Sequence, residues 1–172
     1  MTREERDYQE ALRRIKEAEK NKIVGLDLDG LYLSSFPPEL ASLTSLQSLN
    51  LALCDQLSDL SPLAVLTSLQ SLNLSFCKQL SDLSPLAKLT SLQWLNLSFC
   101  KQLSDLSPLA KLTSLQSLNL AWCKQLSGDL SPLASLTSLQ RLDLAGCGGL
   151  TGNHGTAASK KLGVITLSRS GQ

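Results

Sequence analysis

A 23-residue period constrains this chain more than any other feature. Its cysteines recur at intervals of 23, 23, 23 and 24 residues, at Cys54, Cys77, Cys100, Cys123 and Cys147. Five similar units follow the same phase and begin at Leu43, Leu66, Leu89, Leu112 and Leu136. The second and third of these units differ only where Ser71 is replaced by Trp94. A repeat this short cannot bury its own apolar residues, so the period predicts a solenoid of stacked units.

Each unit contains two apolar patterns. Leu49 and Leu51 alternate with polar Ser48 and Asn50, and alternation at period two predicts a half-buried strand. After the cysteine, leucines follow at every third residue, at Leu57, Leu60, Leu63 and Leu66. A period of three favours 3₁₀-like turns over an α-helix. The sequence therefore predicts an α/β solenoid, with a curved parallel sheet on one side and short 3₁₀ or irregular segments on the convex side.

The same phase extends beyond the five units. On the N-terminal side, four apolar residues lie 23 positions before the corresponding core residues of the next unit, at Ile23, Leu26, Leu28 and Leu31. They predict a divergent first repeat over residues 20–42, with Phe36-Pro37-Pro38-Glu39-Leu40 as its return segment. On the C-terminal side, Leu162, Ile165 and Leu167 continue the phase and predict a seventh strand.

The N-terminal segment has the pattern of a capping helix. Thr2 and Glu5 match a capping box, and apolar residues at helical spacing follow at Tyr8, Ala11, Leu12, Ile15 and Ala18. We expect a helix over residues 3–20 that covers the first repeat, because stacked repeats leave apolar ends that need caps. The alternative is an amphipathic helix that binds a partner.

The C-terminal segment is harder to interpret. Residues 146–161 lose the Leu-Ser-Pro-Leu signature and are rich in glycine, which indicates a loop. Either the last strand is a weak cap or the chain is a fragment of a longer protein, and we favour the fragment. The predicted organisation is a capping helix at 1–22, about six repeats at 23–155, and a degenerate last repeat or cap at 156–172.

Composition excludes several classes of function. The formal net charge is +1, so no general attraction to nucleic acid or to an anionic membrane is expected. The N-terminus has no apolar signal segment, and no apolar run is long enough to span a bilayer. The cysteines form no Cys-x-x-Cys pair, and the lone His154 has no ligand at a zinc-like spacing. We expect reduced, buried thiols, no metal or cofactor, and a cytoplasmic, monomeric protein.

The pattern LxxLxLxxC followed by xxLxxLxPLxxL resembles the leucine-rich-repeat superfamily over nearly the whole chain. The LSPLxxLTSL portion is similar to bacterial internalin-type repeats, and CKQL resembles the cysteine-containing repeats of plant immune receptors. The N-terminal helix with Leu26-Asp27-Leu28-Asp29-Gly30 is similar to bacterial, especially cyanobacterial, intracellular repeat proteins, some of which are Roco GTPases. The resemblance implies recognition of another protein on the concave sheet face.

Outward strand positions supply the candidate binding residues. Trp94 interrupts a row of serines, and an aromatic stripe with a bordering lysine row runs beside it; exposed aromatic residues are typical binding anchors. The candidate partner-binding residues are Trp94, Trp122, Phe99, Phe76, Asn73, Asn96, Asn119, Lys101 and Lys124. As alternatives, the stripe only stabilises the array, and the asparagine and lysine rows are merely solvated. A further outward row is predicted at Ala52, Ser75, Ser98, Ala121 and Ala145.

The function predicted from sequence is a non-enzymatic protein-binding module. An alternative is a regulatory or sensing segment of a larger signalling protein such as a Roco-type GTPase. A distant alternative arises from Asp27-Leu-Asp29-Gly30, which resembles the DxDG motif of magnesium-dependent haloacid-dehalogenase-like phosphatases. The repeat phase already explains those residues. The near-identity of two units also fits recent duplication or consensus design.

Overall fold

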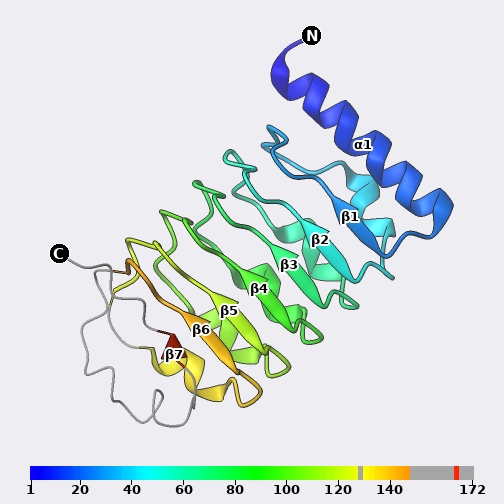
Figure 1. The fold of residues 1–172 in the computed structure, drawn as a ribbon. Helices are drawn as coiled ribbons and strands as arrows, with labels where there is room; N and C mark the ends of the chain where they lie inside the picture. The colour runs from blue at the N-terminus through cyan, green and yellow to red at the C-terminus, as the bar shows by residue number, and fades with distance from the viewer. Residues whose placement is uncertain (128–129, 148–164, 167–172) are drawn as a thin grey trace.

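A computed structural model describes residues 1–127, 130–147 and 165–166, the last pair by its backbone alone. One α-helix, α1 (Arg3–Asn21), precedes a seven-stranded sheet in which every strand pairs in parallel with the next one in sequence. The strands are β1 (Gly25–Asp27), β2 (Ser48–Asn50), β3 (Ser71–Asn73), β4 (Trp94–Asn96), β5 (Ser117–Asn119), β6 (Arg141–Asp143) and β7 (Ile165–Thr166). Figure 1 shows them side by side along the molecule.

The register of the sheet reproduces the sequence period. Leu72 on β3 pairs with Leu95 on β4, 23 residues later, and these two side chains are fully buried together with Leu74 and Leu97. Side chains alternate across a strand, so the leucine pair of each repeat enters one continuous core. The predicted solenoid and its inward leucines are confirmed.

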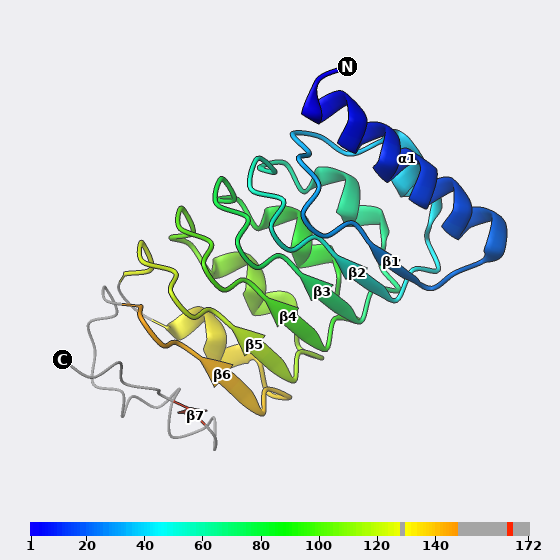
Figure 2. The same ribbon diagram turned by 45° about the horizontal axis from the view of Figure 1, so that its top comes forward.

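The return segments are 3₁₀ turns, as the period of three predicted. They are η1 (Pro38–Ser42), η2 (Ser61–Val65), η3 (Ser84–Lys88), η4 (Ser107–Lys111) and η5 (Ser131–Ser135). Each has proline in its first turn, where no N–H is required. Before η3, the Ser84 N–H donates to Asp82 Oδ1 at 2.8 Å. Figure 2 shows the turns on the side opposite the strands.

Helix α1 caps the first repeat, as predicted. Its capping box is complete, because Thr2 Oγ1 accepts from the Glu5 N–H and Glu5 Oε2 accepts from the Thr2 N–H. Its apolar face, with Ala11, Ile15 and Ala18, is buried, so the surface that the partner-binding alternative needs is already occupied. Arg14 Nη1 donates to the Asp27 carbonyl at 2.9 Å, and Asp7 Oδ2 accepts from the Tyr32 N–H at 3.0 Å. No helix among the described residues has the length and hydropathy to cross a bilayer.

The prediction for Ile23 was wrong. Its register mate Leu46 is fully buried, whereas Ile23 is 42% exposed. The reason is local, because Ile23 directly follows Lys22, the left-handed C-cap of α1. There the Ile23 N–H donates to the Ala18 carbonyl. The chain is still leaving the helix at this point and enters the sheet register at Gly25, the first residue of β1.

The predicted seventh strand is present as β7. Ile165 pairs with Leu142 of β6, again 23 residues apart. Leu162, Leu167, His154 and most of the predicted glycine loop lie outside the described residues.

Candidate protein-binding surface

The outward side of the sheet, here called the sheet face, carries mostly small side chains, and the row at the strand starts has two large ones, Trp94 and Arg141. Trp94 starts β4 and is 38% exposed. Its neighbours in register are Ser71 on β3 and Ser117 on β5, so no adjacent large residue covers the indole. The structure therefore places Trp94 on the sheet face as the sequence predicted. Its role in binding stays a prediction.

The asparagine row has an internal role. The side-chain oxygen of each asparagine accepts a hydrogen bond from the backbone N–H two residues later. For example, Asn96 Oδ1 accepts from the Ser98 N–H at 2.9 Å. Equivalent bonds are made by Asn50, Asn73 and Asn119, and Asp143 takes the same part in β6. These Asx turns bend the chain directly after each strand. Asn73, Asn96 and Asn119 consequently offer a ligand mainly their amide N–H groups.

The predicted outward row after the asparagines was wrong. Ala52, Ser75, Ser98 and Ala121 are buried and Ala145 is half-buried. The Asx turn is the reason. It bends the chain after the asparagine, so the in-and-out alternation of side chains along the strand no longer applies to this row. Only small side chains occupy these positions.

One residue further on, a row of large side chains adopts a left-handed backbone. Leu53, Phe76, Phe99 and Trp122, together called the edge ridge, have φ angles of 62, 62, 61 and 62°. The residues at the same register position in the first and sixth repeats are Gly30 and Gly146, with φ of 69 and 72°. Glycine adopts this conformation without a steric penalty, and bulky L-residues do not. Hydrogen bonds between repeats maintain it, such as Phe76 N–H to the Ser98 carbonyl at 2.9 Å.

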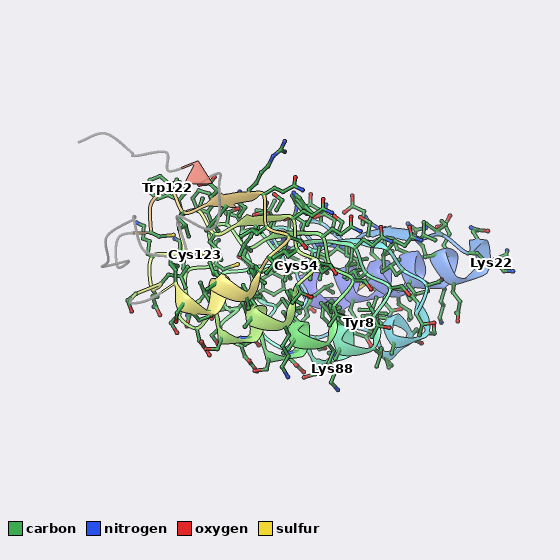
Figure 3. The ribbon with its side chains drawn as sticks, turned by 90° about the horizontal axis from the view of Figure 1, so that it is seen from below. Tyr8, Lys22, Cys54, Lys88, Trp122 and Cys123 are labelled. Carbon is green, nitrogen blue, oxygen red and sulfur yellow. The ribbon has the colours of Figure 1, made fainter. Side chains whose placement is uncertain are left out.

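The aromatic members of the edge ridge stack on one another. The ring centroids of Phe76 and Phe99 are 4.3 Å apart with an interplanar angle of 7°, and those of Phe99 and Trp122 are 5.9 Å apart at 12°. The Trp122 indole also lies over Gly146, where an added Cβ would stand 2.6 Å from the ring. Figure 3 shows Trp122 at the periphery and the neighbouring Cys123 inside. The rings therefore have the stabilising contacts of the simpler alternative, while Trp122 remains 37% exposed.

The lysine row, Lys78, Lys101 and Lys124, lies two residues after the three aromatic members of the edge ridge, and Asp55 holds this position after Leu53. Lys78 Nζ lies 3.4 Å from Asp55 Oδ2 of the preceding repeat. Lys101 and Lys124 are exposed and have no carboxylate within ion-pair distance among the described residues. Lys101 and Lys124 occupy equivalent positions in consecutive repeats, and like charges repel one another. An anion beside these lysines would relieve that repulsion.

The cysteines have a structural position. Each thiol donates to a strand-end carbonyl of the preceding repeat, for example Cys100 Sγ to the Leu74 carbonyl at 3.2 Å, and all five are free thiols. Burial raises the pKa of Cys54 and of Cys123 to about 12, and it raises the pKa of Cys77 and Cys100 as well. Protonated thiols are poor nucleophiles and poor metal ligands.

The aspartates of the DxDG motif belong to the repeat architecture. Asp27 occupies the asparagine position, and its Oδ1 accepts from the Asp29 N–H and from Asn50 Nδ2 at 3.0 and 3.1 Å. Gly30 occupies the left-handed position. No cluster of three potential metal ligands occurs within the described part of the chain. The motif is thus accounted for as the first Asx turn of the solenoid.

Sequence reasoning missed the left-handed conformation of the edge ridge. A signal was present, because Gly30 and Gly146 stand in register with the four large residues. Glycine at both ends of such a row predicts positive φ throughout it. The structure separates two features that the sequence placed side by side. Trp94 starts a strand, whereas the edge ridge follows the strand ends, and none of the ring contacts found among the described residues joins them.

These features define a parallel-stranded solenoid in which every repeat contributes a strand and, through most of the array, a 3₁₀ turn. A family model described as leucine-rich repeats in two copies matches residues 44–88 and 90–134, just over half of the chain. The chain belongs to the leucine-rich-repeat family, whose fold generally serves as a protein–protein interaction module. A search of curated proteins finds no significant match.

Several solved structures are similar. Internalin C2 from Listeria monocytogenes is 28% identical with a TM-score of 0.56, over 86% of this chain and 72% of that one. An internalin (inlF) of the same organism is 26% identical with a TM-score of 0.51, over 95% of this chain and 62% of that one. A chain of the mouse RP105/MD-1 complex is 32% identical with a TM-score of 0.62, over 72% of this chain and 22% of that one. The chain thus spans less than two thirds of the latter two.

Proposed function

We propose that this protein is a non-enzymatic module that binds another protein on its sheet face, which is the concave face in the family. The observation that carries the proposal is the exposure of Trp94 in a row of serines. The near-identical preceding repeat has Ser71 there, so the fold does not need a large side chain at this position. Exposed tryptophans surrounded by small polar residues are typical binding anchors. The proposal includes a monomer in the cytoplasm, which free thiols favour.

Affinity capture followed by direct titration tests this proposal. Proteins captured from host extract by the wild-type chain are titrated against wild type and Trp94→Ser. We expect Trp94→Ser to weaken binding about tenfold or more, as loss of an interface anchor does. Unchanged affinity would refute the anchor.

A matched control comes from the opposite side of the solenoid. Val65 on η2 is an exposed apolar residue whose register mates are Ser42, Lys88, Lys111 and Ser135. Val65→Ser therefore also replaces an exposed apolar residue by the serine of its own row. It should leave both the fold and the affinity unchanged, and an equal loss with Val65→Ser would show that the effect is not specific to the sheet face.

A further inference from the structure

The edge ridge leaves large apolar side chains partly exposed to solvent, even though its rings stack on one another. Leu53 is 51% exposed and Trp122 is 37% exposed, although both adopt the left-handed conformation that favours glycine. The ring contacts among the described residues are Phe76–Phe99 and Phe99–Trp122, so Leu53 gains no ring contact of that kind. Residues held in a strained backbone conformation cluster at functional sites. The large, exposed side chains of the edge ridge therefore suggest a functional surface.

The stacking also restricts what the edge ridge can bind. The nearly parallel rings of Phe76 and Phe99 cover each other, and Trp122 lies over Gly146. Phe99 is thus stacked between two rings and Trp122 between Phe99 and Gly146, which leaves few free ring faces in this strip of aromatic side chains. Single-stranded nucleic acid is bound by stacking bases on free aromatic faces. The strip instead suits aliphatic or aromatic side chains of a protein segment.

The positive charge of the lysine row indicates which protein segments this surface can bind. The lysine row borders the strip two residues later in each repeat, and Lys101 and Lys124 have no carboxylate partner in the described part of the chain. The row has one such partner, Asp55, at its N-terminal end beside Lys78. A basic segment would be repelled here, and an acidic one would be attracted. Three adjacent strands span about 10 Å, which is the length of about three extended residues, so a short segment is sufficient.

We propose that the edge ridge and the lysine row together bind an acidic protein segment that carries large apolar side chains. The segment lies across the repeats, with its apolar side chains on Phe99 and Trp122 and its carboxylates on Lys101 and Lys124. This inference rests on the proposed protein-binding function and names the chemistry of the partner. It assigns a surface at the edge of the sheet, separate from Trp94.

Fluorescence anisotropy with defined probes tests the proposal on the full chain. The probes are short labelled peptide pools of four kinds, namely acidic with apolar residues, basic with apolar residues, acidic with serine and glycine, and uncharged with apolar residues. A pool of single-stranded oligonucleotides is the fifth probe. We expect the acidic apolar pool to bind most tightly, and rising salt to weaken it.

Charge reversal makes the test specific. Lys101→Glu with Lys124→Glu should weaken the acidic apolar pool about tenfold or more and strengthen the basic apolar pool. The matched control is Lys88→Glu with Lys111→Glu, which changes the same charges on the side of the 3₁₀ turns. Figure 3 shows Lys88 on that side, away from Trp122. The control should leave the order of affinities unchanged, and an equal effect of both reversals would overturn the proposal.

Removing the rings completes the design. Phe99→Gly with Trp122→Gly should fold, because glycine occupies this position at Gly30 and Gly146, and circular dichroism checks this. Binding of the acidic apolar pool should then be lost. If the folded variant still binds that pool, the proposal fails. It also fails if no peptide pool is preferred, if a pool other than the acidic apolar one is preferred, or if the oligonucleotides bind most tightly.

Trp94→Ser separates this inference from the proposed function. If a captured partner depends on Trp94 while the peptide pools ignore the edge ridge, the inference fails and the proposed function stands. If Trp94→Ser changes no affinity while the acidic apolar pool depends on Lys101 and Lys124, the sheet-face anchor fails and the edge site stands.

Discussion

Leu53 and its register mates hold a backbone conformation that costs an L-residue roughly 1–2 kcal/mol. The cost recurs in four consecutive repeats. In Phe76, Phe99 and Trp122, ring stacking offsets part of this free-energy cost, because aromatic pairs contribute about 0.5–1.5 kcal/mol beyond their burial. Leu53 has no ring and so gains no aromatic stacking, and its side chain is 51% exposed.

We therefore expect Leu53→Gly to stabilise the fold. Relief of the left-handed strain outweighs the greater chain entropy of glycine, which is about 0.5–1 kcal/mol, so the free energy of unfolding should rise by up to about 1 kcal/mol. Urea denaturation measures it. Leu53→Ala is the control, because it removes the side chain and keeps the strain, and it should not stabilise. A destabilising Leu53→Gly would show that the leucine side chain contributes more to packing than its exposure indicates.

Thiol reactivity offers a second test at this scale. Because burial raises the pKa of Cys54 and Cys123 to about 12, their thiolate form is scarce at pH 8. We expect Cys54, Cys77, Cys100 and Cys123 to react slowly with an aromatic disulfide reagent in the native protein and rapidly in urea. Cys147, which is only partly buried, should react first. Rapid native labelling of all five would contradict the structural role of the buried thiols.

Sequence was sufficient for the core and insufficient for the surface. Leu95 and Leu97 were predictable because their period-two alternation within a 23-residue phase leaves one burial pattern that satisfies every repeat. Stacking of Phe76 on Phe99 was predictable from their places in adjacent repeats, but the ring orientation was not, because it depends on backbone angles that no alternation pattern encodes. Trp94 was placed correctly on the sheet face because its register mate Ser71 shows the position to be open.

At the scale of elements, three of the 3₁₀ turns, η2, η3 and η4, begin with a bond to a preceding aspartate. Asp59, Asp82 and Asp105 accept from the backbone N–H of the serine two residues later, each at 2.8 Å. Bonds from the hydroxyl and the backbone N–H of that serine hold the pKa of each carboxyl below its usual value. These aspartates recur with the repeat period, as expected for turn-forming residues.

The lowered pKa values of these aspartates predict how the free energy of unfolding falls at acid pH. A carboxyl whose pKa is lower in the folded than in the unfolded state contributes stability that is complete above about pH 4, the ordinary aspartate value, and is lost as pH falls through the folded value. Replacing Asp59, Asp82 and Asp105 together by asparagine keeps the acceptor oxygen and removes the titration. The triple variant should lose less stability than wild type between pH 5 and pH 2, as followed by urea midpoints. If the urea midpoints of both proteins fell equally with pH, the pKa values of these carboxyls would not differ between the folded and unfolded states.

Boundaries between elements were the least predictable. Ile23 was wrongly placed in the core because the helix cap at Lys22 delays entry into the repeat. Ser75 and Ser98 were wrongly placed outside because the Asx turns end the strands one residue early. In both cases a local cap or turn overrode the repeat pattern for one or two residues.

At the scale of the whole molecule, each strand and each 3₁₀ turn contacts its counterparts in adjacent repeats. Stability in such an array is a sum of repeat and nearest-neighbour terms, and α1 covers the first repeat. The central claim is that one phase turns a leucine pair inward from each of the strands β1 to β6 and turns the intervening side chains outward. In the repeat that contains β4, this claim distinguishes the outward Trp94 from the inward Leu97.

Denaturant unfolding of two variants of this one repeat tests the claim most directly. Leu97 is fully buried, so Leu97→Ala should lower the free energy of unfolding by about 2–5 kcal/mol through the cavity it leaves. Trp94→Ser restores the residue of the neighbouring repeat and should change it by at most about 0.5 kcal/mol. Loss of the fold in Trp94→Ser, or a loss below about 0.5 kcal/mol in Leu97→Ala, would contradict the account.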